Sequence, residues 1–203
     1  SQGIEHVFGV PSGDWLPYME AMEAGGIEFV LVANEGSAGF MATVYAWLKG
    51  VPGACYGTFG PGATNLATGV GSALLDRAPV LVLTSEAPDD KLGRTKQMMI
   101  DHQALMRPLT KWSTRLNPAN VDQIFARAMQ VANQEYPGPV HSGRPCGIGD
   151  ADAGRSPVVA TPIPPTPAPD RAALAEMERI FARARKPVLA VGLSAVRAEL
   201  GPR

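Results

Sequence analysis

Short apolar runs alternate with longer segments of helical periodicity along most of this 203-residue chain. The apolar runs, which lack polar alternation, lie near residues 4–7, 29–32, 54–56, 80–83 and 139–141, with a further short one near 110–113. The helical segments lie near residues 16–24, 37–49, 63–75 and 120–134. Strands without a polar face, each followed by a helix, are typical of a parallel sheet covered on both sides. The pattern therefore predicts an α/β fold with a doubly wound parallel sheet.

A proline-rich segment interrupts this pattern. Residues 156–169 carry prolines at 157, 162, 164, 165, 167 and 169, which exclude a helix or a central strand there. We therefore expect three parts. A first domain covers residues 1–150, a proline-rich linker covers 151–169, and a second α/β domain starts over 170–203.

The second domain shows one helical segment and one apolar run. Asp170 is expected to cap a helix that ends at about Arg185, and residues 188–192 are expected to form a buried parallel strand. These two elements are too few for a core of their own. The first apolar run also begins almost at residue 1, so we expect the sequence to be a truncated piece of a longer protein.

The composition narrows the class of protein. Hydrophobic residues make up 45% of the chain, and 18 Lys and Arg stand against 19 Asp and Glu, which excludes a disordered segment and a strongly basic nucleic-acid binder. No apolar stretch reaches the roughly 18 residues of a membrane-spanning helix. Two cysteines, without ligand-spaced histidines, provide neither a disulfide framework nor a zinc pattern. We expect a cytoplasmic protein with no nucleic-acid or membrane partner.

Ligands of such sheets bind at the carboxyl ends of the strands, so the turns after the strands are the candidate site. The first turn, at residues 8–14, contains two glycines and a proline, so its backbone could approach a ligand closely. The alternative is a simple tight turn in which Asp14 caps the next helix. The residues alone leave both interpretations open.

Glu35 comes after the second apolar run and precedes a helix, between small residues. A carboxyl partly withdrawn from water at such a place has a raised pKa, which suits a proton donor or acceptor. Alternatively, Glu35 simply occupies a first helical turn and interacts favourably with the helix dipole. Position alone does not decide between the two.

The third turn, at residues 57–62, is rich in glycine but does not match a known phosphate loop. Gly57, Gly60 and Gly62 lack the spacing of the dinucleotide fingerprint, and no Gly-Lys-Ser/Thr comes after them. The helix that this turn opens is rich in small residues. They permit a close approach of another backbone, either within the domain or in a second subunit.

Together these turns resemble one family, the thiamine diphosphate-dependent enzymes of the acetolactate synthase and 2-oxo-acid decarboxylase group. The resembling stretches are VFGVPSG at 7–13, Glu35 and its helix, GTFGPGATNLATGVGSALLDRAPVLVLT at 57–84, DHQALMRPLTKWS at 101–113, and YPGPVH at 136–141. The resemblance is continuous over about residues 1–142. It resumes at 185–203, which resembles the start of the family's middle domain.

The resemblance implies that residues 1–150 are a PYR domain, which binds the aminopyrimidine ring of thiamine diphosphate. It implies that Glu35 is the catalytic residue, because it hydrogen-bonds a ring nitrogen and favours the imino tautomer that activates the cofactor. The implied cofactor-binding residues are Val10, Pro11, Gly13, Glu35, Thr58, Gly62 and Asn65, with Gln97 and Met98 on the substrate side. The implied Mg²⁺ ligands lie outside this segment, so no residue here is assigned to a metal.

The chain departs from the family's usual pattern in places. Phe59 replaces a serine, an aromatic-Gln-Glu triplet is replaced by residues 97–99, and His141 is succeeded by SGRPCGIGD instead of an apolar strand ending. Gly13 and Thr58 stand where some decarboxylases carry protic side chains.

A pocket without a strong proton donor should protonate the intermediate slowly and give a second carbonyl compound time to react. We therefore expect acetolactate synthase-like carboligation by a homodimer or homotetramer that is paired through the PYR domain, with this chain alone inactive. The alternatives are a 2-oxo-acid decarboxylase that releases an aldehyde and a non-catalytic binding or scaffold domain.

Overall fold

A computed structural model describes residues 3–88, 91, 98–149, 151 and 168–197 of the chain. The chain divides into two compact units, Ser1–Ile163 and Pro164–Arg203. Most of the predicted linker at 151–169, and the predicted substrate-side residue Gln97, lie outside the described residues.

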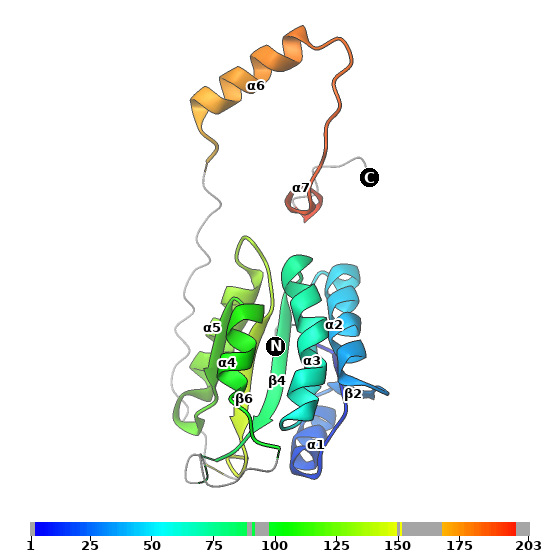
Figure 1. The fold of residues 1–203 in the computed structure, drawn as a ribbon, viewed down its shortest axis with the longest axis vertical. Helices are drawn as coiled ribbons and strands as arrows, with labels where there is room; N and C mark the ends of the chain where they lie inside the picture. The colour runs from blue at the N-terminus through cyan, green and yellow to red at the C-terminus, as the bar shows by residue number, and fades with distance from the viewer. Residues whose placement is uncertain (1–2, 89–90, 92–97, 150, 152–167, 198–203) are drawn as a thin grey trace. The chain divides into compact units, whose positions relative to one another are not determined.

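The first unit is built on a six-stranded sheet in which all neighbouring strands are parallel. The strands lie in the order β2-β1-β3-β4-β6-β5 (Figure 1). Their bounds are β1 His6–Gly9, β2 Glu28–Leu31, β3 Gly53–Gly57, β4 Val80–Glu86, β5 Trp112–Arg115 and β6 Val140–Pro145. With helices on both faces, this arrangement confirms the predicted doubly wound α/β fold.

Helices cover both faces of the sheet. Their bounds are α1 Leu16–Ala24, α2 Glu35–Lys49, α3 Pro61–Leu75, α4 His102–Met106 and α5 Val121–Asn133. Successive residues of β4 point to opposite faces, because side chains alternate along a strand. Val80 and Val82 pack with α2, α3 and α4 in one core cluster, whereas Leu81 and Leu83 pack with α1 and α5 in the other. This double burial explains the continuous apolar runs in the sequence.

Helices α2 and α3 lie side by side (Figure 1) and touch through glycines. A β-carbon added at Gly39 of α2 would lie 2.7 Å from the Cα atom of Gly69 in α3, closer than real side chains come. The small residues of α3 therefore serve packing within the domain at Gly69. At Gly71 the nearest atom to an added β-carbon is Leu109 Cδ2, at 3.7 Å, which is an ordinary van der Waals contact.

The structure extends two predicted elements. Strand β6 continues past His141 to Pro145, because Ser142 and Gly143 pair with both β4 and β5 and the last two residues pair with β4. Helix α2 begins at Glu35 itself instead of Ser37, because the Asn34 side chain caps it. Helix α4 was not predicted, since five residues are too few to show a periodicity.

The second unit contains two described helices, α6 Arg171–Arg183 and α7 Leu193–Arg197. Asp170 caps α6 as expected, because its side chain accepts a hydrogen bond from the Ala173 backbone N–H at 2.8 Å. The predicted strand at 188–192 is wrong, since these residues form no strand and Val188 is 93% exposed. A strand needs a neighbour for its hydrogen bonds, and no described residue of this unit forms one.

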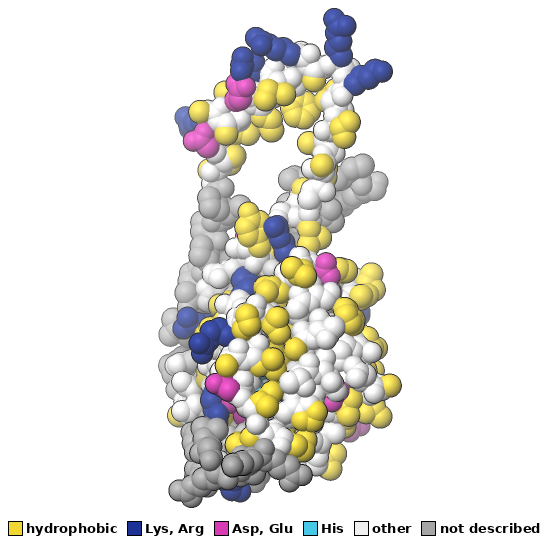
Figure 2. Space-filling model, viewed as in Figure 1, with side chains coloured by type: hydrophobic (Ala, Val, Ile, Leu, Met, Phe, Trp, Pro, Cys, Tyr) yellow, Lys and Arg dark blue, Asp and Glu magenta, His cyan; other side chains and the backbone are white. Residues whose placement is uncertain are grey.

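Exposed hydrophobic side chains gather on α2. Phe40, Val44, Trp47 and Leu48 are all more than 40% exposed. Figure 2 shows hydrophobic side chains on the part of the first unit where α2 and α3 lie in Figure 1. In the described part of the chain, no helix is both long and apolar enough to cross a membrane.

Candidate functional site

All strands of the sheet are parallel, so the turns after β1, β2, β3 and β4 lie along one edge. Because β1 lies between β2 and β3, the turn that carries Val10, Pro11 and Gly13 has the Glu35 turn on one side and the Thr58 turn on the other. The fold therefore brings the three turns predicted from the sequence to one edge, where ligands of such sheets bind.

Glu35 is the first residue of α2 and is only 8% exposed. Its position results from the cap, in which Asn34 Oδ1 accepts a hydrogen bond from the Gly36 backbone N–H at 2.8 Å. Glu35 Oε2 in turn accepts a hydrogen bond from Asn65 Nδ2 of α3, at 3.1 Å. Glu35 is therefore in a first helical turn and is also buried. The structure joins Glu35 to Asn65, 30 residues away in the chain.

Gly62 and Thr58 lie next to Glu35 on the side of the third turn. A β-carbon at Gly62 would lie 2.8 Å from Thr58 Cγ2 and 3.3 Å from Glu35 Oε1, so only glycine fits there without movement. Thr58 Oγ1 is buried and has no hydrogen-bond partner among the described residues. Buried polar atoms without a partner are rare. The buried Glu35 carboxyl group and the Thr58 hydroxyl could bind a ligand that has polar atoms along one edge.

Gly60 holds the turn in a conformation that favours glycine, with φ of +42°. A β-carbon at this position would lie 2.6 Å from the backbone oxygen of Met98. The structure therefore places Met98, a predicted substrate-side residue, against the third turn, although its side chain is 45% exposed.

The first turn is tied to the sheet by a buried polar cluster. Tyr56 Oη lies 2.9 Å from Ser12 Oγ and 2.8 Å from Ser85 Oγ, and Ser85 Oγ donates to Asp14 Oδ2 at 2.8 Å. Asp14 does not cap a helix as the alternative interpretation expected, because its carboxylate pairs with Arg144. Burial disfavours its ionised form, but hydrogen bonds from Ser12, Ser85 and Cys146 and the Arg144 charge outweigh burial and lower the pKa of Asp14.

Arg144 is the main residue of this edge that sequence reasoning missed. It is 2% exposed at the end of β6, and its guanidinium lies 4.4 Å from the ring centroid of Tyr18 and 5.3 Å from that of Trp15. The acidic partner and the aromatic rings are more than 120 residues away in the sequence, so no local pattern indicated the cluster.

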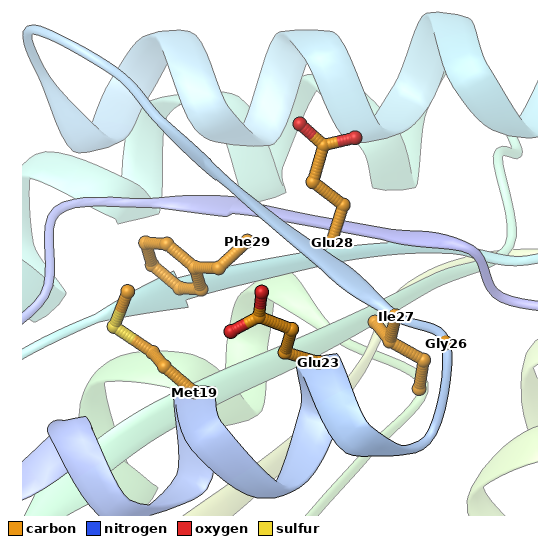
Figure 3. A pocket seen from close by; sticks show the side chains of 6 residues that line it. All are labelled: Met19, Glu23, Gly26, Ile27, Glu28 and Phe29. Atoms are coloured by element: carbon orange, nitrogen blue, oxygen red, sulfur yellow. The ribbon is translucent and has the colours of Figure 1, made fainter.

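A separate pocket of about 410 Å³ lies between α1 and β2. Figure 3 shows its six lining residues, Met19, Glu23, Gly26, Ile27, Glu28 and Phe29, which come from these two elements and the turn between them. The pocket is at the amino end of β2, whereas Glu35 lies beyond the carboxyl end, and it contains none of the predicted site residues.

In the described ranges, no group of three or more His, Cys, Asp or Glu side chains could hold a metal ion. The residues that could hold an organic cofactor are Glu35, Thr58, Gly62 and Asn65, which form one contact group.

Comparison with known proteins agrees with this geometry. Residues 1–105, just over half of the chain, match the family model of the thiamine pyrophosphate enzyme N-terminal TPP binding domain. The acetolactate synthase isozyme 2 large subunit of Escherichia coli is 35% identical over 193 residues, which are 95% of this chain and 35% of that protein.

Two further relatives differ from each other in the activity that their names state. A probable acetolactate synthase large subunit of Methanocaldococcus jannaschii is 33% identical over 153 residues, covering 75% of this chain and 26% of its own length. A probable 2-ketoarginine decarboxylase of Pseudomonas aeruginosa is 35% identical over 202 residues, which cover 97% of this chain and 36% of that protein. The chain thus spans about a third of the length of the curated relatives that it matches. The family match and the fold together show that the chain belongs to the thiamine pyrophosphate-dependent enzymes and carries their N-terminal, pyrimidine-binding (PYR) domain.

Proposed function

We propose that this chain provides the pyrimidine-binding side of a thiamine diphosphate site in an enzyme that acts on 2-oxo acids, and that Glu35 is its catalytic residue. The observation that carries the proposal is the buried Glu35 carboxylate at the ligand-binding edge of the sheet, held by Asn65 at 3.1 Å. The chemistry supplied by the bound cofactor is stabilisation of a carbanion derived from the 2-oxo acid.

The role of Glu35 is inferred from its surroundings. Oε2 is engaged with Asn65, and Oε1 lies on the side of Gly62, where an added β-carbon would come within 3.3 Å of it. A carboxyl group in this setting can share a proton with a nitrogen at the edge of an aromatic ring and thereby hold the ring in one tautomer. Thr58 Oγ1, buried without a partner among the described residues, supports a second polar contact with the ring.

The proposal is tested by Glu35→Gln in a full-length protein that contains this chain. Glutamine keeps the shape of the side chain but cannot share a proton, so we expect exchange of the cofactor C2 proton to slow by about 10²- to 10⁴-fold. The matched control is Glu20→Gln on the exposed surface of α1, which should leave the exchange unchanged. Near-normal exchange in Glu35→Gln would remove Glu35 from the mechanism.

The reaction that we propose is acetolactate synthase-like carboligation. Gly13 and Thr58 carry no ionisable side chain, and the Asp14 carboxylate next to Gly13 is paired with Arg144. A β-carbon at Gly13 would meet no atom within 4 Å, so that region is open. The Pseudomonas aeruginosa relative favours a second candidate, a decarboxylase. Product analysis with pyruvate distinguishes them, because acetaldehyde as the dominant product would contradict carboligation.

We also propose that the cofactor's diphosphate and Mg²⁺ are held by residues outside this sequence, and that the enzyme is a homo-oligomer. The proposal on the diphosphate and Mg²⁺ is supported by the length of the matched relatives, which are about three times as long as the aligned segment. Support for the second comes from the exposed apolar side chains of α2, including Phe40 and Trp47. Turnover of a 2-oxo acid by the purified 203-residue chain would contradict the first proposal.

A further inference from the structure

A chain of hydrogen bonds leads from the third turn through buried side chains of α4, β4, β6 and β5. It begins at the Gly60 backbone N–H and ends at Glu86, which pairs with Arg115 at 2.8 Å. The side chains between these ends are, in order, His102, Thr84, His141, Ser113 and Gln103. Both histidines are at most 3% exposed, so water does not compete for these contacts.

The direction of the hydrogen bonds is fixed at the Glu86 end. Gln103 Nε2 lies 2.6 Å from Glu86 Oε1 and 3.1 Å from the backbone oxygen of Thr114, which are both acceptors, so the amide orientation is determined. Gln103 Oε1 therefore accepts the single hydroxyl proton of Ser113, at 2.8 Å. Ser113 Oγ can then only accept from His141 Nδ1, also at 2.8 Å, which places the His141 proton on Nδ1.

The Gly60 end fixes the direction independently. The Gly60 N–H donates to His102 Nε2 at 3.2 Å, so this nitrogen carries no proton and the proton is on Nδ1. His102 Nδ1 donates to Thr84 Oγ1 at 2.9 Å, and the Thr84 hydroxyl donates to His141 Nε2 at 2.8 Å. The proton positions derived from the two ends therefore agree: His141 Nε2 carries no proton and can accept the hydrogen bond from Thr84.

The neutral state of both rings agrees with this direction. Burial lowers the pKa of His102 to about 4 and the pKa of His141 to about 3. A protonated His102 would also point an N–H group at the Gly60 N–H, where only an acceptor fits.

The turn anchored by this chain of hydrogen bonds is the one that completes the Glu35 site. Gly60 is the residue before Pro61, where α3 begins. Helix α3 carries Asn65, which donates a hydrogen bond to Glu35, and Gly62, where an added β-carbon would lie 3.3 Å from Glu35 Oε1. We infer that His102, Thr84 and His141 are positioning residues, which hold the Gly60 turn so that Asn65 and Gly62 keep Glu35 in place. This inference rests on the proposed function of Glu35 for its catalytic consequence, but the hydrogen-bond direction itself does not.

Two substitutions of the same histidine separate its two contacts. His102→Gln can place an amide oxygen near the Nε2 position and so still accept from Gly60. His102→Asn is shorter and can keep only the donor near the Nδ1 position, toward Thr84. We expect amide hydrogen exchange of Gly60 to be about tenfold faster in His102→Asn and nearly unchanged in His102→Gln. The amide of Val82, buried in β4, is the internal control for an intact fold.

The second measurement needs neither variants nor cofactor. Nitrogen-15 NMR of the full chain should show both His102 and His141 as neutral rings with the proton on Nδ1. A proton on Nε2 of either ring, or equal Gly60 exchange in the two His102 variants, would overturn the inference even if a variant folded poorly.

The catalytic consequence is tested in the full-length protein. C2 proton exchange of thiamine diphosphate should slow in His102→Asn and recover in His102→Gln, and equal rates in both variants would count against a positioning role. Failure of the proposed function would appear differently, as normal C2 exchange in Glu35→Gln with the tautomers and the Gly60 exchange as expected.

Discussion

Alanine at Gly69 and alanine at Gly71 are expected to change the stability of this protein in opposite directions. The two glycines lie two residues apart inside the same 15-residue helix, α3, so both substitutions gain the same helix propensity. Replacing glycine by alanine inside a helix stabilises it by roughly 0.5–1 kcal/mol. Any difference in stability between the two variants therefore results from the contacts that each new methyl group makes.

The surroundings of the two methyl groups differ sharply. At Gly69 a β-carbon would lie 2.6 Å from the backbone oxygen of Gly36 and 2.7 Å from the Cα atom of Gly39, so helix α2 would have to move. Overpacking of this kind costs about 1–3 kcal/mol. At Gly71 the methyl group would lie 3.7 Å from Leu109 Cδ2, an ordinary contact.

We therefore expect Gly69→Ala to be less stable than Gly71→Ala by about 1–3 kcal/mol, or roughly 2–12 °C in Tm for a chain of this size. Urea unfolding monitored by circular dichroism, together with thermal melts of both variants, measures the difference. The reasoning would be refuted if Gly69→Ala were as stable as Gly71→Ala. That result would mean that the small residues of α3 do not serve the contact with α2.

Three further outcomes are expected. Arg144→Met should lower the free energy of unfolding by about 1.5–3 kcal/mol, because the partly buried Asp14 carboxylate would lose its cation, and Asp14→Asn in the same variant should recover part of the loss. Gly143→Ala should destabilise by about 1–3 kcal/mol, since a β-carbon there would overlap the Glu86 carboxylate and displace it from Gln103 and Arg115; a neutral effect in a urea titration would contradict the close approach. Stability should fall as the pH drops below about 6.5, because unfolded histidines bind protons there whereas the folded rings bind them only near pH 4 for His102 and pH 3 for His141. The expected slope is up to about 1.4 kcal/mol per pH unit for each histidine, and a flat profile between pH 6.5 and 5 would contradict it.

The sequence by itself determined the fold class and the edge of the sheet that carries the site. Apolar runs without polar alternation predict a doubly buried parallel sheet, because both faces of each strand must be apolar. Parallel strands put all their carboxyl ends on one edge, so the turns at Val10, Glu35 and Thr58 were brought together by topology alone. These predictions rest on local periodicity and chain direction, which a sequence records directly.

The tertiary structure alone decided which polar groups meet. The contact of Glu35 with Asn65, the pairing of Asp14 with Arg144, and the hydrogen bonds from Gly60 to Glu86 join residues that are tens of positions apart. It also decided that the apolar run at 188–192 forms no strand, since a strand exists only where a neighbour accepts its hydrogen bonds. Hydrogen bonds and ion pairs depend on distances of a few ångströms between side chains, and a sequence determines such distances only through the packing of the whole domain.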